Sequence, residues 1–164
     1  MQPGWRILPA DFDDAHLFDD PRLQALLTLH LDGMRRYSPA CGSHALDLSG
    51  LKAPGVTLYT LWHDEALLGM SALRLHPDGV AEIKSMRTHP DHLGRGVGRV
   101  LLEHLIAEAR RQGCHRLSLE TGSGPAFDAA LNLYGARGFK RGESFGGYTA
   151  SDFNQFYHLD LQAA

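Results

Sequence analysis

The sequence predicts a mixed α/β fold, in which one mostly antiparallel, twisted sheet carries helices on both of its faces. Three runs, Val56–Trp62, Leu67–Leu75 and Val80–Thr88, are joined by turn sequences and are typical of an antiparallel meander. Over Gly96–Gln112 the apolar residues recur instead with a helical period. Strands and helices alternate on either side of the meander, so we expect the helices to cover a single sheet.

Composition and charge predict one globular domain over residues 1–164, with a core from about 5 to 161. The chain is 43% hydrophobic and 21% charged, which suffices for a buried core. Its net charge of -3 gives no basic field that attracts nucleic acid or an anionic membrane. No apolar run approaches the ~20 residues of a membrane span, and two cysteines are too few for a disulfide framework. We therefore expect a cytoplasmic protein.

The N-terminal part is predicted to form a strand, a long helix and a break. Trp5–Pro9 has the pattern of a short strand. A proline suits the first turn of a helix, and the apolar residues that follow extend this helix over Pro21–Tyr37. The turn-forming residues Ser38–Ser43 end it, and a short helical turn is expected around Leu46–Leu51.

The C-terminal part is predicted to alternate between strands and helices. Gly113 follows the long helix and is placed as its left-handed cap. Arg116–Glu120 is expected to be a short strand, and Pro125–Arg137 a helix. Phe145–Tyr148 and Phe153–Leu161 are expected to close the sheet as strands.

The most informative segment is the glycine turn, residues Gly94–Arg99, between the meander and the long helix. It carries glycines at alternate positions, which let the backbone approach a ligand closely. The first N–H groups of a helix lack internal acceptors and lie at the positive end of its dipole, so they bind phosphate groups well. Arg95 and Arg99 add positive charge. The segment predicts a phosphate-bearing ligand, although glycines that only shape a tight turn would give the same pattern.

Other phosphate and metal motifs fit the sequence poorly. A P-loop requires a lysine after its last glycine, and none follows Gly98. A dinucleotide fingerprint requires a third glycine where Leu101 stands, inside a parallel unit. The nearest histidine pair, His89 and His92, has no cluster of further ligands around it, so no metal is predicted.

The glycine turn resembles the pyrophosphate loop of the GNAT superfamily of acyl-CoA-dependent N-acyltransferases. The family pattern is Arg/Gln-x-x-Gly-x-Gly/Ala, which Gly96 and Gly98 match, while Leu93 stands at the Arg/Gln position. That departure removes a side chain, but the family binds pyrophosphate mainly through backbone amides.

A second family signature, Leu-Tyr-x-x-x-Gly-Phe, is matched by Leu133–Phe139. Ala130 fits the position three residues before it, whereas the Asn often found three residues earlier still is Phe127 here. Both signatures occur in the order that the family has, and the resemblance extends over nearly the whole chain.

The resemblance implies a sheet that is splayed midway and acetyl-CoA as the co-substrate, without a metal. Backbone N–H groups near Met86 to Thr88 would hold the oxyanion that forms on the acetyl group. The residues implied in acetyl-CoA binding are Met86, Arg87, Thr88, Gly94, Arg95, Gly96, Val97, Gly98, Arg99 and Ala130.

Two side chains are the candidate catalytic groups. Glu82 lies in the strand before the glycine turn, where family members often place the base that deprotonates the acceptor amine. Tyr134, placed by the second signature, would protonate the leaving thiolate. The alternatives are a Glu82 that pairs with an arginine or faces solvent, and a Tyr134 that only packs in the core.

The acceptor site is expected under the first helices and their connecting loop, which in the family cover one side of the splayed sheet. The candidate residues there are Arg35, Ser38 and His44, with Tyr148 as the opposite wall. An arginine at this place can clamp a carboxylate with two hydrogen bonds. The alternative is that Arg35 and Arg36 form a solvated helix end favoured by the dipole.

Together these features predict an N-acetyltransferase that moves an acetyl group from acetyl-CoA to the amine of a small molecule or amino-acid-like acceptor. The alternative is a non-catalytic acyl-CoA-binding or sensing module, which the presence of both Glu82 and Tyr134 disfavours. The predicted partner is the small-molecule amine, with no nucleic acid and no membrane, and a homodimer is left open.

Overall fold

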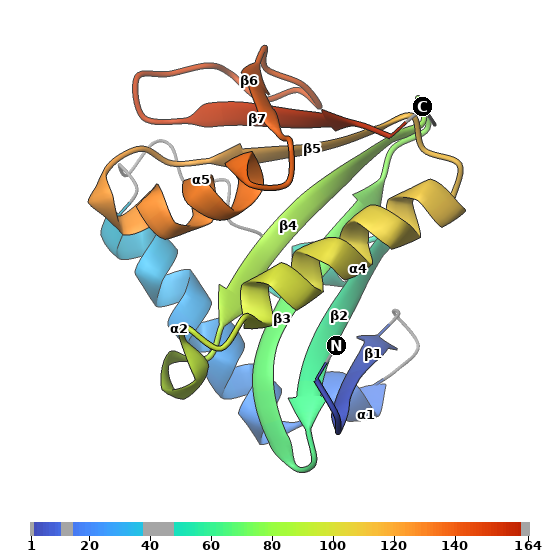
Figure 1. Cartoon of the computed structure of the whole chain (residues 1–164), viewed down its shortest axis with the longest axis vertical. Coiled ribbons are helices and arrows are strands. Elements are labelled where there is room, and N and C mark those ends of the chain that lie inside the picture. Colours follow the sequence, from blue (N-terminus) through green and yellow to red (C-terminus); the bar gives the residue numbers. More distant parts are fainter. Residues whose placement is uncertain (1, 11–14, 38–47, 162–164) are drawn as a thin grey trace.

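The computed structural model describes residues 2–10, 15–37 and 48–161, and it places a seven-stranded sheet between two layers of helices (Figure 1). The strands are β1 (Trp5–Ala10), β2 (Val56–His63), β3 (Ala66–Leu75), β4 (Val80–Thr88), β5 (Arg116–Thr121), β6 (Lys140–Gly142) and β7 (Gln155–Asp160). The α-helices are α1 (Ala15–Phe18), α2 (Pro21–Tyr37), α3 (Leu48–Leu51), α4 (Val97–Arg111) and α5 (Asp128–Gly135). Two 3-10 turns are η1 (Pro90–His92) and η2 (Pro125–Phe127).

The sheet confirms the predicted mixed, mostly antiparallel fold. Its strand order is β1-β2-β3-β4-β5-β7-β6, and β1 to β4 form the expected antiparallel meander. The one parallel pair is β4 with β5, which α4 connects by crossing one face of the sheet. Antiparallel strands β7 and β6 complete the sheet beyond β5.

Apolar clusters hold the helices on opposite faces of this sheet. On one face, α4 and α5 pack on the central strands through residues such as Leu102, Leu105 and Tyr134. On the other, α1, α2 and α3 pack on β2 and β3, with Leu23, Leu26, Leu27, Leu58 and Met70 among the most buried side chains. Burying an apolar stripe of each helix is what fixes it to the sheet.

Helix α4 agrees closely with its sequence pattern. Its predicted apolar stripe, Val97, Leu101, Leu105 and Ala109, is almost fully buried. The helix ends at Gly113, which has a φ of 74° and donates its N–H to the carbonyl of Arg110. That left-handed residue closes the helix as predicted, because glycine takes a positive φ without strain.

Strand β4 changes direction midway, and this irregularity opens the sheet. Ser85 has a φ of 51°, and the register with β3 shifts between Met70 and Ala72. An extra residue of this kind is a β-bulge, which bends its strand and strengthens the local twist. Pairing with β5 ends at Ile83 and Leu119, so the rest of β4 diverges from its neighbour.

The end of the chain differs from the sequence-based prediction. Phe145–Tyr148 is a turn rather than a strand: the Tyr148 N–H donates to the Phe145 carbonyl, and both intervening glycines have a positive φ. The edge strand is instead β6, Lys140–Gly142, and the last strand begins at Gln155 rather than at Phe153. Two consecutive residues in the left-handed conformation suit a tight turn and cannot continue an extended strand. The two glycines therefore outweigh the preference for a strand that the aromatic residues of this segment give.

Smaller differences concern the helices. The predicted helix over residues 125–137 begins as the 3-10 turn η2 and becomes α-helical only over α5. Helix α1 was not predicted, and α3 covers the described part of the turn expected around Leu46–Leu51. Among the described residues, no helix is long and apolar enough to cross a membrane.

Candidate active site

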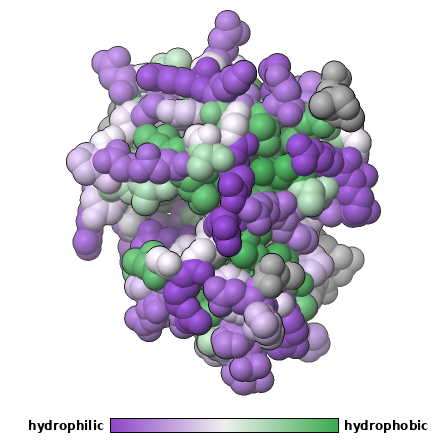
Figure 2. All heavy atoms as spheres, viewed as in Figure 1, coloured by the Kyte–Doolittle hydropathy of each residue, from purple (hydrophilic) through white to green (hydrophobic). Residues whose placement is uncertain are grey.

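A cavity of about 550 Å³ lies where β4 and β5 diverge. Helix α2 borders it on one side, and α5 with the start of α4 on the other. In the space-filling view the surface is hollowed where α5 approaches the start of α4 (Figure 2). Its volume is in the range of small-molecule sites, and its walls are largely apolar, with a few polar groups. The apolar lining includes Met34, Ile83, Met86, Leu119, Phe127 and Leu133.

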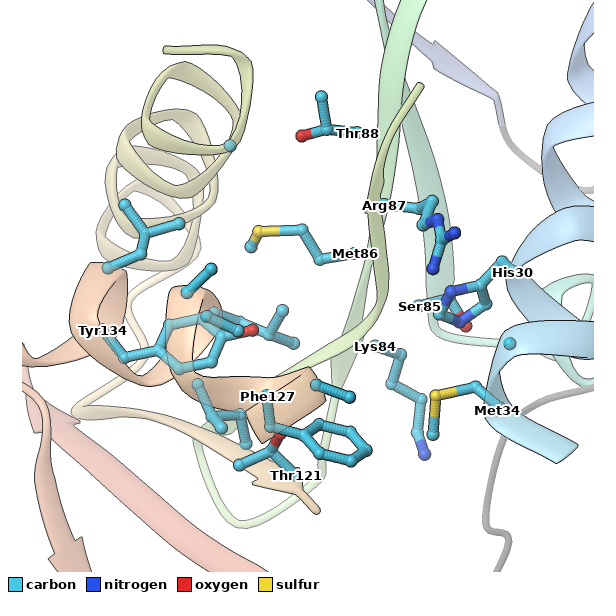
Figure 3. Close-up of a pocket in the computed structure, with 18 of the residues that line it drawn as sticks. His30, Met34, Lys84, Ser85, Met86, Arg87, Thr88, Thr121, Phe127 and Tyr134 are labelled. Atoms are coloured by element: carbon cyan, nitrogen blue, oxygen red, sulfur yellow. The ribbon is translucent and has the colours of Figure 1, made fainter. Parts of the chain in front are cut away.

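Strand β4 presents different side chains to the two sides of the cavity. Met86 and Thr88 point toward α4 and α5, whereas Ser85 and Arg87 point toward α2 (Figure 3). This follows from the alternation of side chains along a strand. Beyond Ile83, β5 no longer pairs with β4, so the backbone edge of Met86–Thr88 borders the cavity.

The glycine turn lies next to this edge and opens α4. Gly94 and Gly96 have φ values of 72° and 84°, and a Cβ on either would meet no atom within 4 Å. Helical hydrogen bonding starts with the Val100 N–H, which donates to the Gly96 carbonyl, so the preceding N–H groups have no acceptor within the helix. Arg95 and Arg99 are exposed beside them.

Gly98 is the glycine of this turn that lines the cavity. A Cβ there would lie 3.2 Å from the Leu133 side chain of α5 and 3.7 Å from the Thr88 hydroxyl. The start of α4 therefore approaches both α5 and β4 closely at this point. The turn offers an anion a positive helix end and an open backbone surface.

Glu82 is the buried acid of the cavity, with 2% of its surface exposed. One carboxylate oxygen lies 2.8 Å from His76 Nε2, and the other accepts a hydrogen bond from the Tyr148 hydroxyl and lies 3.1 Å from Lys84 Nζ. Lys84 also donates to the Tyr148 oxygen at 2.5 Å. We call Glu82, Lys84, His76 and Tyr148 the carboxylate cluster. It holds a buried negative charge with a matching cation and two further hydrogen-bonding side chains.

The Tyr148 hydroxyl remains protonated within this cluster. Burial raises its pKa, and the adjacent negative charge of Glu82, which accepts its proton in a hydrogen bond, raises it further. The side chain of His76 is 15% exposed, so the cluster extends from the buried carboxylate to the surface of the protein.

Tyr134 lies in the cavity wall formed by α5, and its side chain points into the cavity (Figure 3). Its ring packs against Phe139, with 5.8 Å between ring centroids. Burial raises the pKa of Tyr134 to about 12, and no hydrogen bond to its hydroxyl contributes to that shift. At neutral pH this hydroxyl is a protonated donor on the α5 side of the cavity.

The glycine turn, the opened sheet and the two-sided cavity agree with comparisons to known proteins. Residues 23–139 match the model of the acetyltransferase (GNAT) family. The chain is 43% identical over 141 residues to the uncharacterized N-acetyltransferase YedL of Escherichia coli strain K12, covering 86% of this chain and 89% of that protein. The chain belongs to the GNAT family.

Solved structures agree with this assignment. A Klebsiella pneumoniae protein described as an acyl-CoA N-acyltransferase superposes with a TM-score of 0.76 and 28% identity, over 96% of this chain and 98% of that chain. YncA of Salmonella typhimurium, solved with its cofactor acetyl-CoA, has the same fold, with a TM-score of 0.68 and 22% identity over 98% and 96% of the two chains. This GNAT protein is therefore an acyltransferase of the N-acetyltransferase type.

Most residues implied in acetyl-CoA binding lie along one path in this GNAT fold. Met86, Arg87, Thr88, Gly98 and Ala130 line the cavity, and the remaining members continue from it along the turn. The Val97 side chain is 1% exposed in the core, so only its backbone can face a ligand.

The two departures from the GNAT signatures have clear positions. Leu93 is 67% exposed at one end of the cavity. Phe127 lines the cavity near η2 and packs edge-to-face on Phe153, with 5.7 Å between ring centroids. The aromatic ring thus adds apolar surface where the family often has an amide.

The predicted acceptor residues are not brought together in the described part of the chain. Tyr148 lines the cavity, but Arg35 is exposed, pairs with Asp32 at 3.6 Å and is not in the cavity wall. Ser38 and His44 lie outside the described residues.

Sequence reasoning missed several polar groups, among them Lys84 and His30, which line the cavity, and His76, which contacts Glu82. It named Arg87 only as a residue implied in acetyl-CoA binding. Alternation along β4 gives a signal for Lys84, two residues after Glu82. His76 could not be found in this way, because its contact with Glu82 depends on how β3 turns into β4.

Proposed function

We propose that this GNAT protein transfers an acetyl group from acetyl-CoA to the amine of a small-molecule acceptor by direct attack on the thioester. Glu82 serves as the base and Tyr134 as the acid. The observation that carries the proposal is that both side chains line one cavity, at the point where β4 leaves β5.

Acetyl-CoA is proposed to bind along the glycine turn and enter the opened sheet. Its pyrophosphate would meet the free N–H groups at the start of α4, with Arg95 and Arg99 adding charge. Its acyl end would lie against the apolar lining and the backbone edge of Met86–Thr88, where N–H groups can stabilise the oxyanion. The acetyl-CoA bound to YncA, which shares the fold, supports this choice of co-substrate.

The proton balance assigns a role to each catalytic side chain. Glu82 accepts one proton of the acceptor ammonium, directly or through a water, and His76 offers that proton a way to solvent. The neutral amine then forms the new C–N bond and the C–S bond breaks. Tyr134 gives its proton to the departing thiolate, and the second proton released from the nitrogen restores the tyrosine. The products are the N-acetylated acceptor, free CoA and one proton.

Thiol release tests this proposal. The purified protein is supplied with acetyl-CoA and a panel of amines and amino acids, and free CoA and the mass of the acetylated acceptor are both measured. We expect equal amounts of the two products with at least one class of amine. Tight binding of acetyl-CoA without transfer to any amine would favour an acyl-CoA-binding or sensing module instead.

A further inference from the structure

Arg87 is a cation of the cavity that no described residue of the chain neutralises. Its side chain lines the cavity on the α2 side (Figure 3), and no described residue forms an ion pair or hydrogen bond with it. Lys84, directly before the bulge residue Ser85, is by contrast paired with Glu82 at 3.1 Å. A half-buried guanidinium without an anion has lost part of its hydration and lacks compensation.

Helix α2 leaves room for this guanidinium. Gly33 faces it, and a Cβ at that position would lie 3.2 Å from Arg87 Nη1. A glycine inside a helix is destabilising relative to alanine, so its presence in α2 indicates that the space itself is needed. Arg87 therefore has a defined place between β4 and α2.

Two further polar side chains border the same place. His30 of α2 lines the cavity and is 8% exposed, and Ser85 lies beside it at the bulge of β4 (Figure 3). Burial, and secondarily the positive charge of Arg87, lower the pKa of His30 to about 4, so the imidazole is neutral at pH 7. One cation with neutral hydrogen-bonding groups around it forms a site for a singly charged anion.

Resting on the proposed function, we infer that Arg87 binds a carboxylate of the acceptor, which is therefore an amino acid or another small amine with an acidic group. A planar guanidinium accommodates a carboxylate with two parallel hydrogen bonds. Glu82, the proposed base, and Glu120 line another part of the same cavity, where the amine of this molecule would lie. A doubly charged phosphate would need a second free cation, and Lys84 is already paired.

The test compares the amino acids with their carboxamides as acceptors in the thiol-release assay, with an aminoalkyl phosphonate as a third arm. In Arg87→Gln the positive charge is lost, and a shorter neutral amide remains. We expect its KM for amino acids to rise about 10- to 100-fold relative to its KM for the carboxamides, the value of a charged hydrogen bond. Amino acids and their carboxamides differ in the basicity of the amine. The diagnostic quantity is therefore the change, upon substitution, in the ratio of the KM for amino acids to the KM for carboxamides.

The matched control is Arg110→Gln, at an exposed arginine in the last turn of α4. This variant should leave the ratio of the KM for amino acids to the KM for carboxamides unchanged. A second readout measures competitive inhibition by N-acetylated amino acids and by their amides. The acids should inhibit the wild type more strongly than the amides, whereas Arg87→Gln should be inhibited equally by both. Thermal melting shows whether each variant is folded.

The outcomes separate this inference from the function on which it rests. A preference for neutral amines in the wild type, or an unchanged ratio in a folded Arg87→Gln, overturns the carboxylate anchor while acetyl transfer stands. Preference for the phosphonate likewise overturns it. If acetyl-CoA binds and no amine of any class releases thiol, the proposed function itself is wrong.

Discussion

Tyr134 combines two properties at the scale of a single residue: a fully protonated hydroxyl and a position in the cavity wall. Substituting Tyr134→Phe removes one oxygen and keeps the packing on Phe139. Turnover should fall about 100-fold for lost acid catalysis, whereas affinity for acetyl-CoA and thermal stability should hold, since no hydrogen bond to a described residue is broken. Steady-state kinetics and calorimetric titration with acetyl-CoA measure the two effects. Equal turnover in both proteins would make Tyr134 a core residue only.

Glu82 should behave differently, because it carries structure as well as chemistry. Glu82→Gln leaves Lys84, whose side chain is 8% exposed, without its counter-charge. Removing one partner of a buried pair destabilises by about 3–5 kcal/mol, and chemical unfolding should show a loss of this order. Residual activity should be lost most at low pH, where the acceptor amine most needs a base.

The double variant Glu82→Gln with Lys84→Met separates these two roles. It removes both charges, so most of the stability should return while activity does not. Recovery of activity along with stability would mean that Glu82 has only a structural function.

At the scale of elements, the glycine turn is the part that depends most on backbone geometry. Gly98→Glu adds bulk 3.2 Å from Leu133 and a negative charge at the positive start of α4. Acetyl-CoA binding should be abolished, as measured by calorimetry on the folded variant. Gly98→Ala is the matched control, because it adds a side chain without the charge. Its affinity for acetyl-CoA should lie between that of the wild type and that of Gly98→Glu. Unchanged affinity in Gly98→Glu would remove the pyrophosphate from this turn.

The elements also show what a sequence predicts well. Helix α4 and its Gly113 cap follow from local signals, an apolar period and a glycine, and both are confirmed. The bulge at Ser85 was not predictable, because serine carries no preference for a left-handed conformation and the strain is maintained by pairing with β3. Phe145–Tyr148 was mispredicted because its aromatic residues suggested a strand, while Gly146 and Gly147 form a turn.

At the scale of the whole molecule, the site is assembled from segments far apart in sequence. Glu82 and Tyr148 are 66 positions apart and meet in one hydrogen bond, and His30 of α2 and Arg87 of β4 line the same cavity. Family signatures predict the acetyl-CoA path and Tyr134, and the family's usual position for the base, in the strand before the glycine turn, predicts Glu82. The contacts of His76 and Tyr148 with Glu82, and an Arg87 that no described residue pairs, arise from the tertiary arrangement, which no spacing rule encodes.

The same assembly gives the molecule a pH-dependent stability. The His30 side chain of α2 is buried, and its pKa falls from 6.5 to about 4 on folding. Since the His30 imidazole binds a proton more tightly in the unfolded state than in the folded state, protonation favours unfolding. The contribution of neutral His30 to stability is therefore fully present above pH 6.5 and is lost as the pH falls toward 4. At 1.36 kcal/mol per pH unit, the loss amounts to roughly 3 kcal/mol.

His30→Leu keeps an apolar group in the buried site and removes the titration. Urea unfolding at pH 7.5 and pH 4 should therefore show a smaller acid loss in His30→Leu than in the wild type, by up to roughly 3 kcal/mol. Arg87→Gln should lie between them, since burial is the larger cause of the lowered His30 pKa and the Arg87 charge the smaller one. If all three proteins lose the same free energy of unfolding between pH 7.5 and pH 4, the His30 imidazole is solvated in the folded state, and its burial does not lower its pKa.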